Sequence, residues 1–192
     1  KPLFFISCPI DTYSGYGARS RDLVRAIIQL DKYDVRVIPQ MWGNTPWGFI
    51  NDNPEWEFLN KHLWTQPQLP KQPEIWMQIT IPSEFQPIGK YNIGVTAEIE
   101  TTVSPGDWIE GCNRMNLILG SSKHTIDVLK NSKWEKRDKQ TNQSQGTLEY
   151  KVGSPHLTSK GEVFKGSYDL QVNSEVARCL YNFTSAPIQA NI

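Results

Sequence analysis

The chain has 192 residues and carries 20 basic and 20 acidic side chains, so its net charge is zero. A neutral chain argues against electrostatic attraction as the main force for binding duplex DNA or an anionic membrane surface, and we expect no nucleic-acid partner. It contains no run of 18 apolar residues and no signal-peptide pattern, so we expect a cytoplasmic protein without a membrane span.

Cysteine and histidine are sparse and scattered along the chain. The three cysteines form no Cys-x-x-Cys pair, and the three histidines show no spacing typical of metal ligands. This pattern favours buried apolar cysteines over a disulfide scaffold or a zinc site. We therefore expect no metal and no bound cofactor.

The first 135 residues alternate between strand-like and helix-like patterns. The apolar run at 3–7 is typical of a strand buried on both faces, and apolar side chains three and four residues apart indicate a helix over 19–30. Further strands are predicted at 33–39, 74–81, 92–99 and 116–122, and further helices at 55–63, 107–115 and 121–132. This order predicts an α/β, doubly wound, mainly parallel sheet, that is, a Rossmann-like domain over 1–135.

The remainder of the chain has a different character. A polar run without apolar residues predicts a linker at 136–147, which leaves open a break in the chain there. Beyond it, alternating patterns at 161–172, 176–183 and 187–192 predict a small antiparallel β module over 148–192. Few residues are available for an independent core, so we expect this module to be incomplete or to pair with another part or another chain.

The loop after the first strand contains Gly15 and Gly17 and leads into the predicted helix. Ligands of doubly wound sheets bind beyond the carboxyl ends of the strands, where glycines let backbone N–H groups approach an anion. Arg19 and Arg21 would add positive charge. The loop matches neither the dinucleotide fingerprint nor the Walker pattern, so an ordinary tight turn remains the alternative. Asp11 in the same loop either binds an acceptor hydroxyl or caps the turn.

Two further pairs of side chains are candidates for chemistry. Glu98 and Glu100 are two residues apart and would share one face of a strand, where a carboxylate could act as a base or orient a sugar hydroxyl. The alternative is a pair of solvated carboxylates. Trp42 and Trp47 follow the second strand and could stack on a sugar ring, or could equally fill an edge of the core.

Four segments in this order resemble a known family. They read PIDTYSGYGARSRDLVRAI, YDVRVIPQ, IGVTAEIETT and NLILGSSKHTIDVLKNS. Together they resemble the N-terminal Rossmann half of glycosyltransferases with the two-domain GT-B fold, family four, and especially the glycosyltransferase-like proteins of tailed phages. The resemblance covers about residues 1–145.

The resemblance implies a set of site residues and a co-substrate. It implies that Ser14, Gly15, Tyr16 and Gly17 face the donor diphosphate and the acceptor sugar. It also implies that 97–102 face the cleft, and that Lys123 lies near it with Ser121 and Ser122. A nucleotide sugar is then the expected co-substrate.

The chain departs from this family in two ways. Many members have a histidine after the fourth strand, where this chain has Glu98, Ile99 and Glu100. Only 57 residues follow Glu135, which is too few for a second Rossmann domain. We therefore expect the donor-binding half to be absent from this chain.

Two functions remain open. The first is a glycosyltransferase that moves a sugar from a nucleotide donor to an acceptor. The second is a structural or adhesion protein of a virion-like assembly, which uses the domain as a scaffold and the β module to dock on a protein partner. A phage-encoded chain would act in the host cytoplasm or in the virion.

Overall fold

The computed structural model describes residues 1–97, 101–153, 156–157 and 163–164. The strands predicted at 176–183 and 187–192 lie outside the described residues, as does most of the one predicted at 161–172. No helix in the described part of the chain is both long enough and apolar enough to cross a bilayer.

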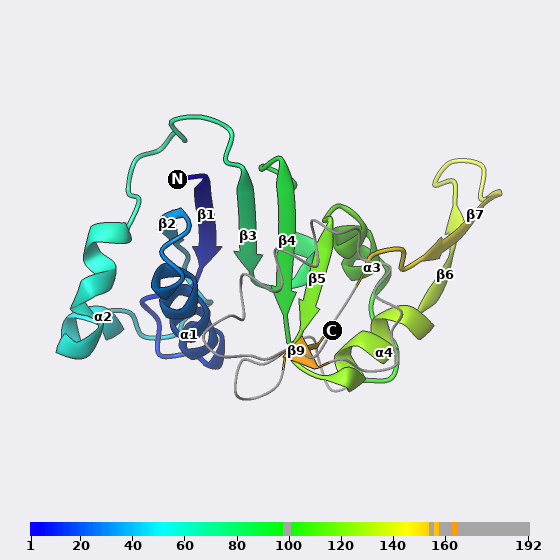
Figure 1. The fold of residues 1–192 in the computed structure, drawn as a ribbon. Coiled ribbons are helices and arrows are strands. Elements are labelled where there is room, and N and C mark those ends of the chain that lie inside the picture. The colour runs from blue at the N-terminus through cyan, green and yellow to red at the C-terminus, as the bar shows by residue number, and fades with distance from the viewer. Residues whose placement is uncertain (98–100, 154–155, 158–162, 165–192) are drawn as a thin grey trace.

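The centre of the molecule is a parallel sheet, which confirms the predicted α/β class (Figure 1). Its first five strands lie in the order β2-β1-β3-β4-β5, and β8 and β9 continue the sheet beyond β5. Neighbouring strands are parallel from β2 to β8, with Phe4 opposite both Val35 and Ile75, and among the described strands of this sheet only β9 runs antiparallel to its neighbour. The strands are β1 (Leu3–Cys8), β2 (Asp34–Pro39), β3 (Ile75–Ile79), β4 (Tyr91–Thr96), β5 (Leu117–Gly120), β8 (His156–Leu157) and β9 (Val163–Phe164).

Helices cover both faces of the sheet because β1, β3 and β5 are apolar on both faces. Phe4 and Ile6 of β1 face α1 (Gly15–Gln29), which buries an apolar stripe that includes Leu23. Phe5 points to the opposite face, where α3 (Gly106–Asn113) and α4 (Lys123–Asn131) bury side chains such as Ile109. The result is a doubly wound core.

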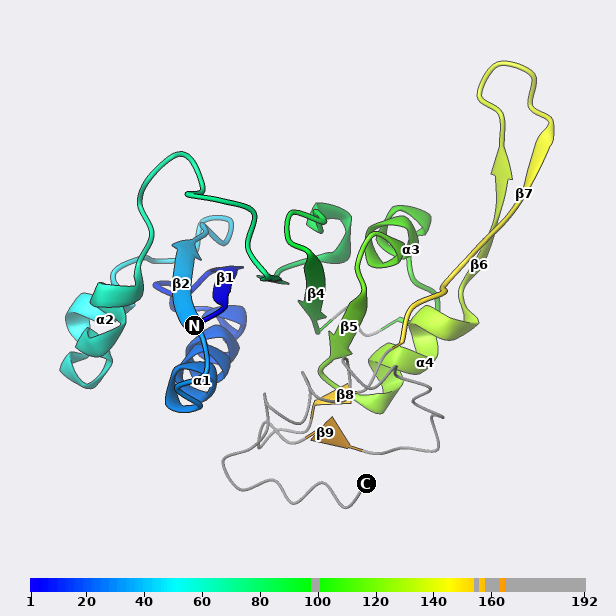
Figure 2. The same ribbon diagram turned by 45° about the horizontal axis from the view of Figure 1, so that its top comes forward.

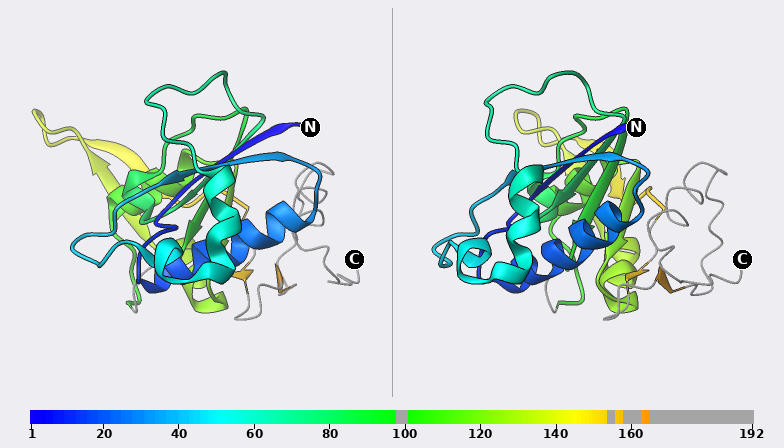
Figure 3. Two further views of the ribbon diagram at one scale, coloured as in Figure 1. Left: turned by 90° about the vertical axis from the view of Figure 1, so that its left-hand side faces the viewer. Right: turned by 60° about the vertical axis from the view of Figure 1, so that its left-hand side comes forward.

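Short helical segments connect the strands. The helix predicted at 55–63 is a 3₁₀ segment, η1 (Pro54–His62), and it follows α2 (Phe49–Asp52). A further 3₁₀ turn, η2 (Pro82–Glu84), lies between β3 and β4. Figure 3 shows α1 and α2 together on one side of the sheet.

The polar run after α4 folds differently from our prediction. Instead of an irregular linker it forms an antiparallel hairpin of β6 (Lys133–Arg137) and β7 (Ser144–Glu149), which projects from the body of the domain (Figure 2). Trp134 and Leu148 are paired across its base, where the Trp134 indole N–H donates to the Ser104 carbonyl at 2.9 Å and Leu148 is buried. The polar residues beyond this base face solvent on both sides, which is why hydropathy alone did not reveal the strands.

Candidate functional site

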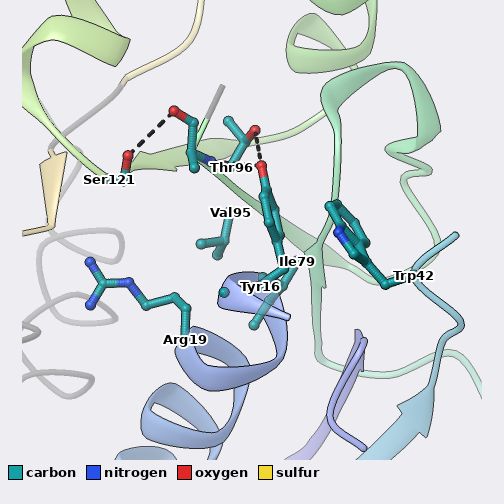
Figure 4. A pocket seen from close by; sticks show the side chains of 9 residues that line it. Tyr16, Arg19, Trp42, Ile79, Val95, Thr96 and Ser121 are labelled. Carbon is teal, nitrogen blue, oxygen red and sulfur yellow. Dashed lines mark hydrogen bonds between the residues drawn. The ribbon is translucent and has the colours of Figure 1, made fainter. Parts of the chain in front are cut away.

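A cavity of about 300 Å³ lies at the carboxyl ends of the strands, close to the start of α1 (Figure 4). After β1 the chain passes through α1 to β2 on one side and later returns to β3 on the other, so the strand order reverses beside β1. Ligands of open α/β sheets bind in the crevice at such a point. The lining consists of Gly15, Tyr16, Arg19, Trp42, Ile79, Val95, Thr96, Ala97 and Ser121.

Some residues at the start of α1 line the cavity, and others shape the turn that leads into the helix. Ser14 is the N-cap of α1, and its hydroxyl accepts a hydrogen bond from the N–H of Gly17 at 2.8 Å. A Cβ on Gly17 would lie 2.3 Å from the carbonyl oxygen of Thr12, so this glycine allows the loop and helix to touch. A Cβ on Gly15 would meet nothing within 4 Å. Gly15 and Tyr16 line the cavity, whereas Ser14 and Gly17 shape the turn.

Tyr16 connects the start of α1 to the end of β4. Its hydroxyl accepts a hydrogen bond from the Ala97 N–H at 2.9 Å and lies 3.2 Å from the Thr96 hydroxyl. Its ring stacks on Trp42, with ring centroids 4.1 Å apart and an interplanar angle of 23°. Figure 4 shows Trp42 and the Thr96 hydroxyl on different sides of the Tyr16 side chain. Trp42 therefore lines the cavity, and its stacking on a sugar ring stays a prediction.

The end of β4 is held from the other side by β5 and α4. The Ala97 carbonyl accepts hydrogen bonds from the hydroxyls of Ser121, at 3.3 Å, and Thr125, at 2.9 Å. The Ser121 N–H donates to the Thr96 carbonyl at 3.1 Å. The backbone of residue 97 is therefore fixed between two helices. The candidate carboxylates Glu98 and Glu100 follow immediately and lie outside the described residues.

Two basic side chains near the cavity, Arg19 and Lys123, differ in whether they line it. Arg19 is the one charged side chain of the described lining, and it extends from α1 away from Trp42 (Figure 4). Lys123 does not line the cavity, and its ammonium group pairs with Asp127 of α4 at 2.6 Å. Arg19 is therefore the described cation best placed to meet an anion in the cavity.

Arg21 takes a different role from the anion contact considered from the sequence. It is buried, and its guanidinium donates to the carbonyls of Ile10 and Thr12 at 2.9 and 2.8 Å. It also lies over the Phe49 ring, 3.4 Å from its centroid. Burial lowers the pKa of Arg21. Arg21 thus positions the loop from within the core.

Asp11 and Trp47 also lie outside the lining. The Asp11 carboxylate accepts the N–H of Ile50 at 2.7 Å, and its carbonyl accepts the N–H groups of Gly48 and Phe49. Asp11 therefore caps the start of α2, a segment far away in the sequence, and not the turn of its own loop. Trp47 is 46% exposed and its backbone forms a β-bridge with Thr12.

The described residues offer little to metal or thiol chemistry. They contain no group of three or more His, Cys, Asp or Glu side chains that could hold a metal ion. Burial raises the pKa of the Cys8 thiol to about 12, so this thiol keeps its proton at neutral pH. Chemistry at this site would depend on the polar side chains of the described lining, which are those of Tyr16, Arg19, Thr96 and Ser121.

The sequence did not single out three residues of the described lining, Ile79, Val95 and Thr96. Each is at or near the carboxyl end of a buried strand. That position is the signal that could have identified them, because ends of parallel strands meet at one edge of the sheet.

No family model, curated protein or solved structure matches this chain. What the structure establishes about the resemblance is the parallel, Rossmann-like α/β core.

Proposed function

We propose that this chain is a glycosyltransferase-like domain that binds a nucleotide sugar and its acceptor at the cavity beside Tyr16. The observation that carries the proposal is the position of the cavity, at the carboxyl edge of a parallel sheet where the strand order reverses. The start of α1 and the ends of β3, β4 and β5 all lie at this edge.

The groups around the cavity suit such a ligand. Sugar transfer releases a nucleoside diphosphate, whose negative charge must be stabilised. The first N–H groups of α1, at Gly15 and Tyr16, lie at the positive end of the helix dipole, and Arg19 adds a full charge. The stacked rings of Tyr16 and Trp42 provide a flat surface for a ring of the ligand. A second domain, supplied by another chain or segment, would contribute the remaining donor contacts.

The direct test is isothermal titration of the purified chain with uridine and guanosine diphosphate sugars. We expect at least one class to bind, and Arg19→Ala to weaken its binding about tenfold, since the variant removes a charge-assisted contact to phosphate. Lys123→Ala is the matched control, because Lys123 is a nearby basic residue that does not line the cavity. Absence of binding by both classes, or equal loss in the two variants, contradicts the proposal.

A second candidate is a scaffold protein that docks in an assembly. The projecting hairpin favours it, because β6 and β7 form a two-stranded sheet within the described residues and expose most of their side chains. An exposed strand edge can pair with a strand of another chain. This candidate requires no nucleotide-sugar binding.

A further inference from the structure

We infer that the cavity beside Tyr16 takes a flat, largely apolar ring that bears an anionic group, such as an aryl or heteroaryl phosphate, in preference to a pyranose ring. This inference rests on the proposed function, since it names the part of the donor or acceptor that occupies the cavity.

The first step is the apolar character of the lining. Ile79 and Val95 are almost fully buried and contribute apolar surface from β3 and β4. Tyr16 and Trp42 add a pair of stacked rings. An aromatic surface alone does not discriminate, because both sugar faces and aromatic rings pack on it. The discrimination between a sugar and an aromatic ring therefore depends on the polar groups of the lining.

The second step is that these polar groups are already engaged. The described part of the lining has three hydroxyl groups, and those of Tyr16 and Thr96 are hydrogen-bonded to each other. The Ser121 hydroxyl donates to the Ala97 carbonyl. Among the described residues the lining contains no Asp, Glu, Asn, Gln or His side chain. A pyranose has several hydroxyls that lose water on burial and each require a partner, and these exceed the unengaged side-chain acceptors that the described part of the lining offers.

The third step concerns charge and size. Arg19 extends on the opposite side of Tyr16 from Trp42 in Figure 4, so the cavity has an aromatic end and a cationic end. A volume of about 300 Å³ is at the lower limit for small-molecule pockets. One ring system with one anionic substituent fits this size and this polarity. The ring could belong to the donor base or to an aromatic acceptor, which share this chemistry.

The test is titration of the full chain with four probes, with binding measured by calorimetry and by saturation-transfer NMR. The probes are phenyl phosphate, uridine monophosphate, glucose 1-phosphate and inorganic phosphate. We expect phenyl phosphate to bind about tenfold more tightly than glucose 1-phosphate or inorganic phosphate. Uridine monophosphate binding as tightly as phenyl phosphate assigns the ring to the donor base, and weaker binding assigns it to the acceptor.

Variants locate the bound ring. Trp42→Ala should weaken phenyl phosphate binding about five- to tenfold, because one ring of the stacked pair is lost. Trp47→Ala is the matched control, since this tryptophan lies in the same loop outside the lining, and it should leave affinity unchanged. Arg19→Ala is a second variant on an independent contact and should weaken all anionic probes.

The outcomes separate this inference from the proposed function. If glucose 1-phosphate binds as tightly as phenyl phosphate, or if Trp42→Ala and Trp47→Ala behave alike, the inference is overturned. Nucleotide-sugar binding would still support the proposed function in that case. If phenyl phosphate binds at Trp42 and no nucleotide sugar binds, the inference stands and the proposed function fails.

Discussion

At Gly17 a single methyl group decides how closely α1 can pack on the loop before it. The Cβ of any other residue would lie 2.3 Å from the Thr12 carbonyl oxygen and 2.9 Å from that of Pro9. Both are backbone atoms, which cannot rotate away as a side chain can. Gly17 is therefore a packing requirement of the turn that presents Tyr16.

We expect Gly17→Ala to lower the free energy of unfolding by about 2–3 kcal/mol, because loop and helix must separate to admit the methyl group. Urea denaturation measures this change. Gly15→Ala is the matched control, since its Cβ meets nothing within 4 Å, and it should change stability by less than about 1 kcal/mol. Equal midpoints for Gly17→Ala and the parent chain would contradict this assignment.

At this scale the sequence predicted positions better than roles. The loop with Gly15 and Tyr16 was expected at the carboxyl edge of the sheet, and both residues line the cavity there. The capping of a distant segment by Asp11 and the inward orientation of Arg21 depend on where 46–50 folds back, and no local pattern encodes that contact. The different roles of Gly15 and Gly17 likewise depend on how closely the loop packs on α1, because only Gly17 lies against the carbonyl groups of Pro9 and Thr12.

Among the elements, β1 and β3 share an electrostatic clasp at their amino ends. The Glu74 carboxylate, just before β3, accepts the Leu3 N–H of β1 at 2.8 Å and pairs with Lys71 at 3.2 Å. These contacts hold the pKa of Glu74 at about 2, against an ordinary value of 4.5. The charged form is therefore favoured in the folded state.

This clasp predicts a pH dependence. Because the folded pKa of Glu74 is depressed, its contribution to stability is present above pH 4.5 and is lost as the pH falls towards 2. We expect Glu74→Gln to flatten the decline of the unfolding midpoint across that window. Glu57→Gln, which removes an exposed carboxylate from η1, is the control. A variant whose decline matches the parent's would refute the contribution of the clasp.

The elements that the sequence predicted are those with a strong apolar pattern. β1, β3 and α1 bury continuous runs or a helical stripe, so each pattern specifies one structure. The β6–β7 hairpin has no such pattern, and one indole hydrogen bond and one buried leucine anchor it at the base. Such contacts are visible only in the folded chain.

The whole molecule consists of a sheet domain with a projecting hairpin. In the second candidate function, copies of the chain associate through this hairpin. This candidate predicts oligomers of the full chain in light scattering. Replacing 137–145 by a short Gly-Asn turn should give a monomer with an unchanged melting temperature, because Trp134 and Leu148 at the base are retained. A full chain that is monomeric at every concentration tested speaks against the candidate.

One helix joins the cavity to the hairpin. Near the start of α4, Thr125 holds the Ala97 carbonyl, and directly after its end the Ser132 hydroxyl accepts the N–H of Ser104 at 2.7 Å. The carbonyl of Ser104 in turn receives the Trp134 indole. The cavity and the hairpin are thus bonded to opposite ends of one short helix. A shift of α4 along its own axis would move its contact with Ala97 and its contact with Ser104 by the same distance.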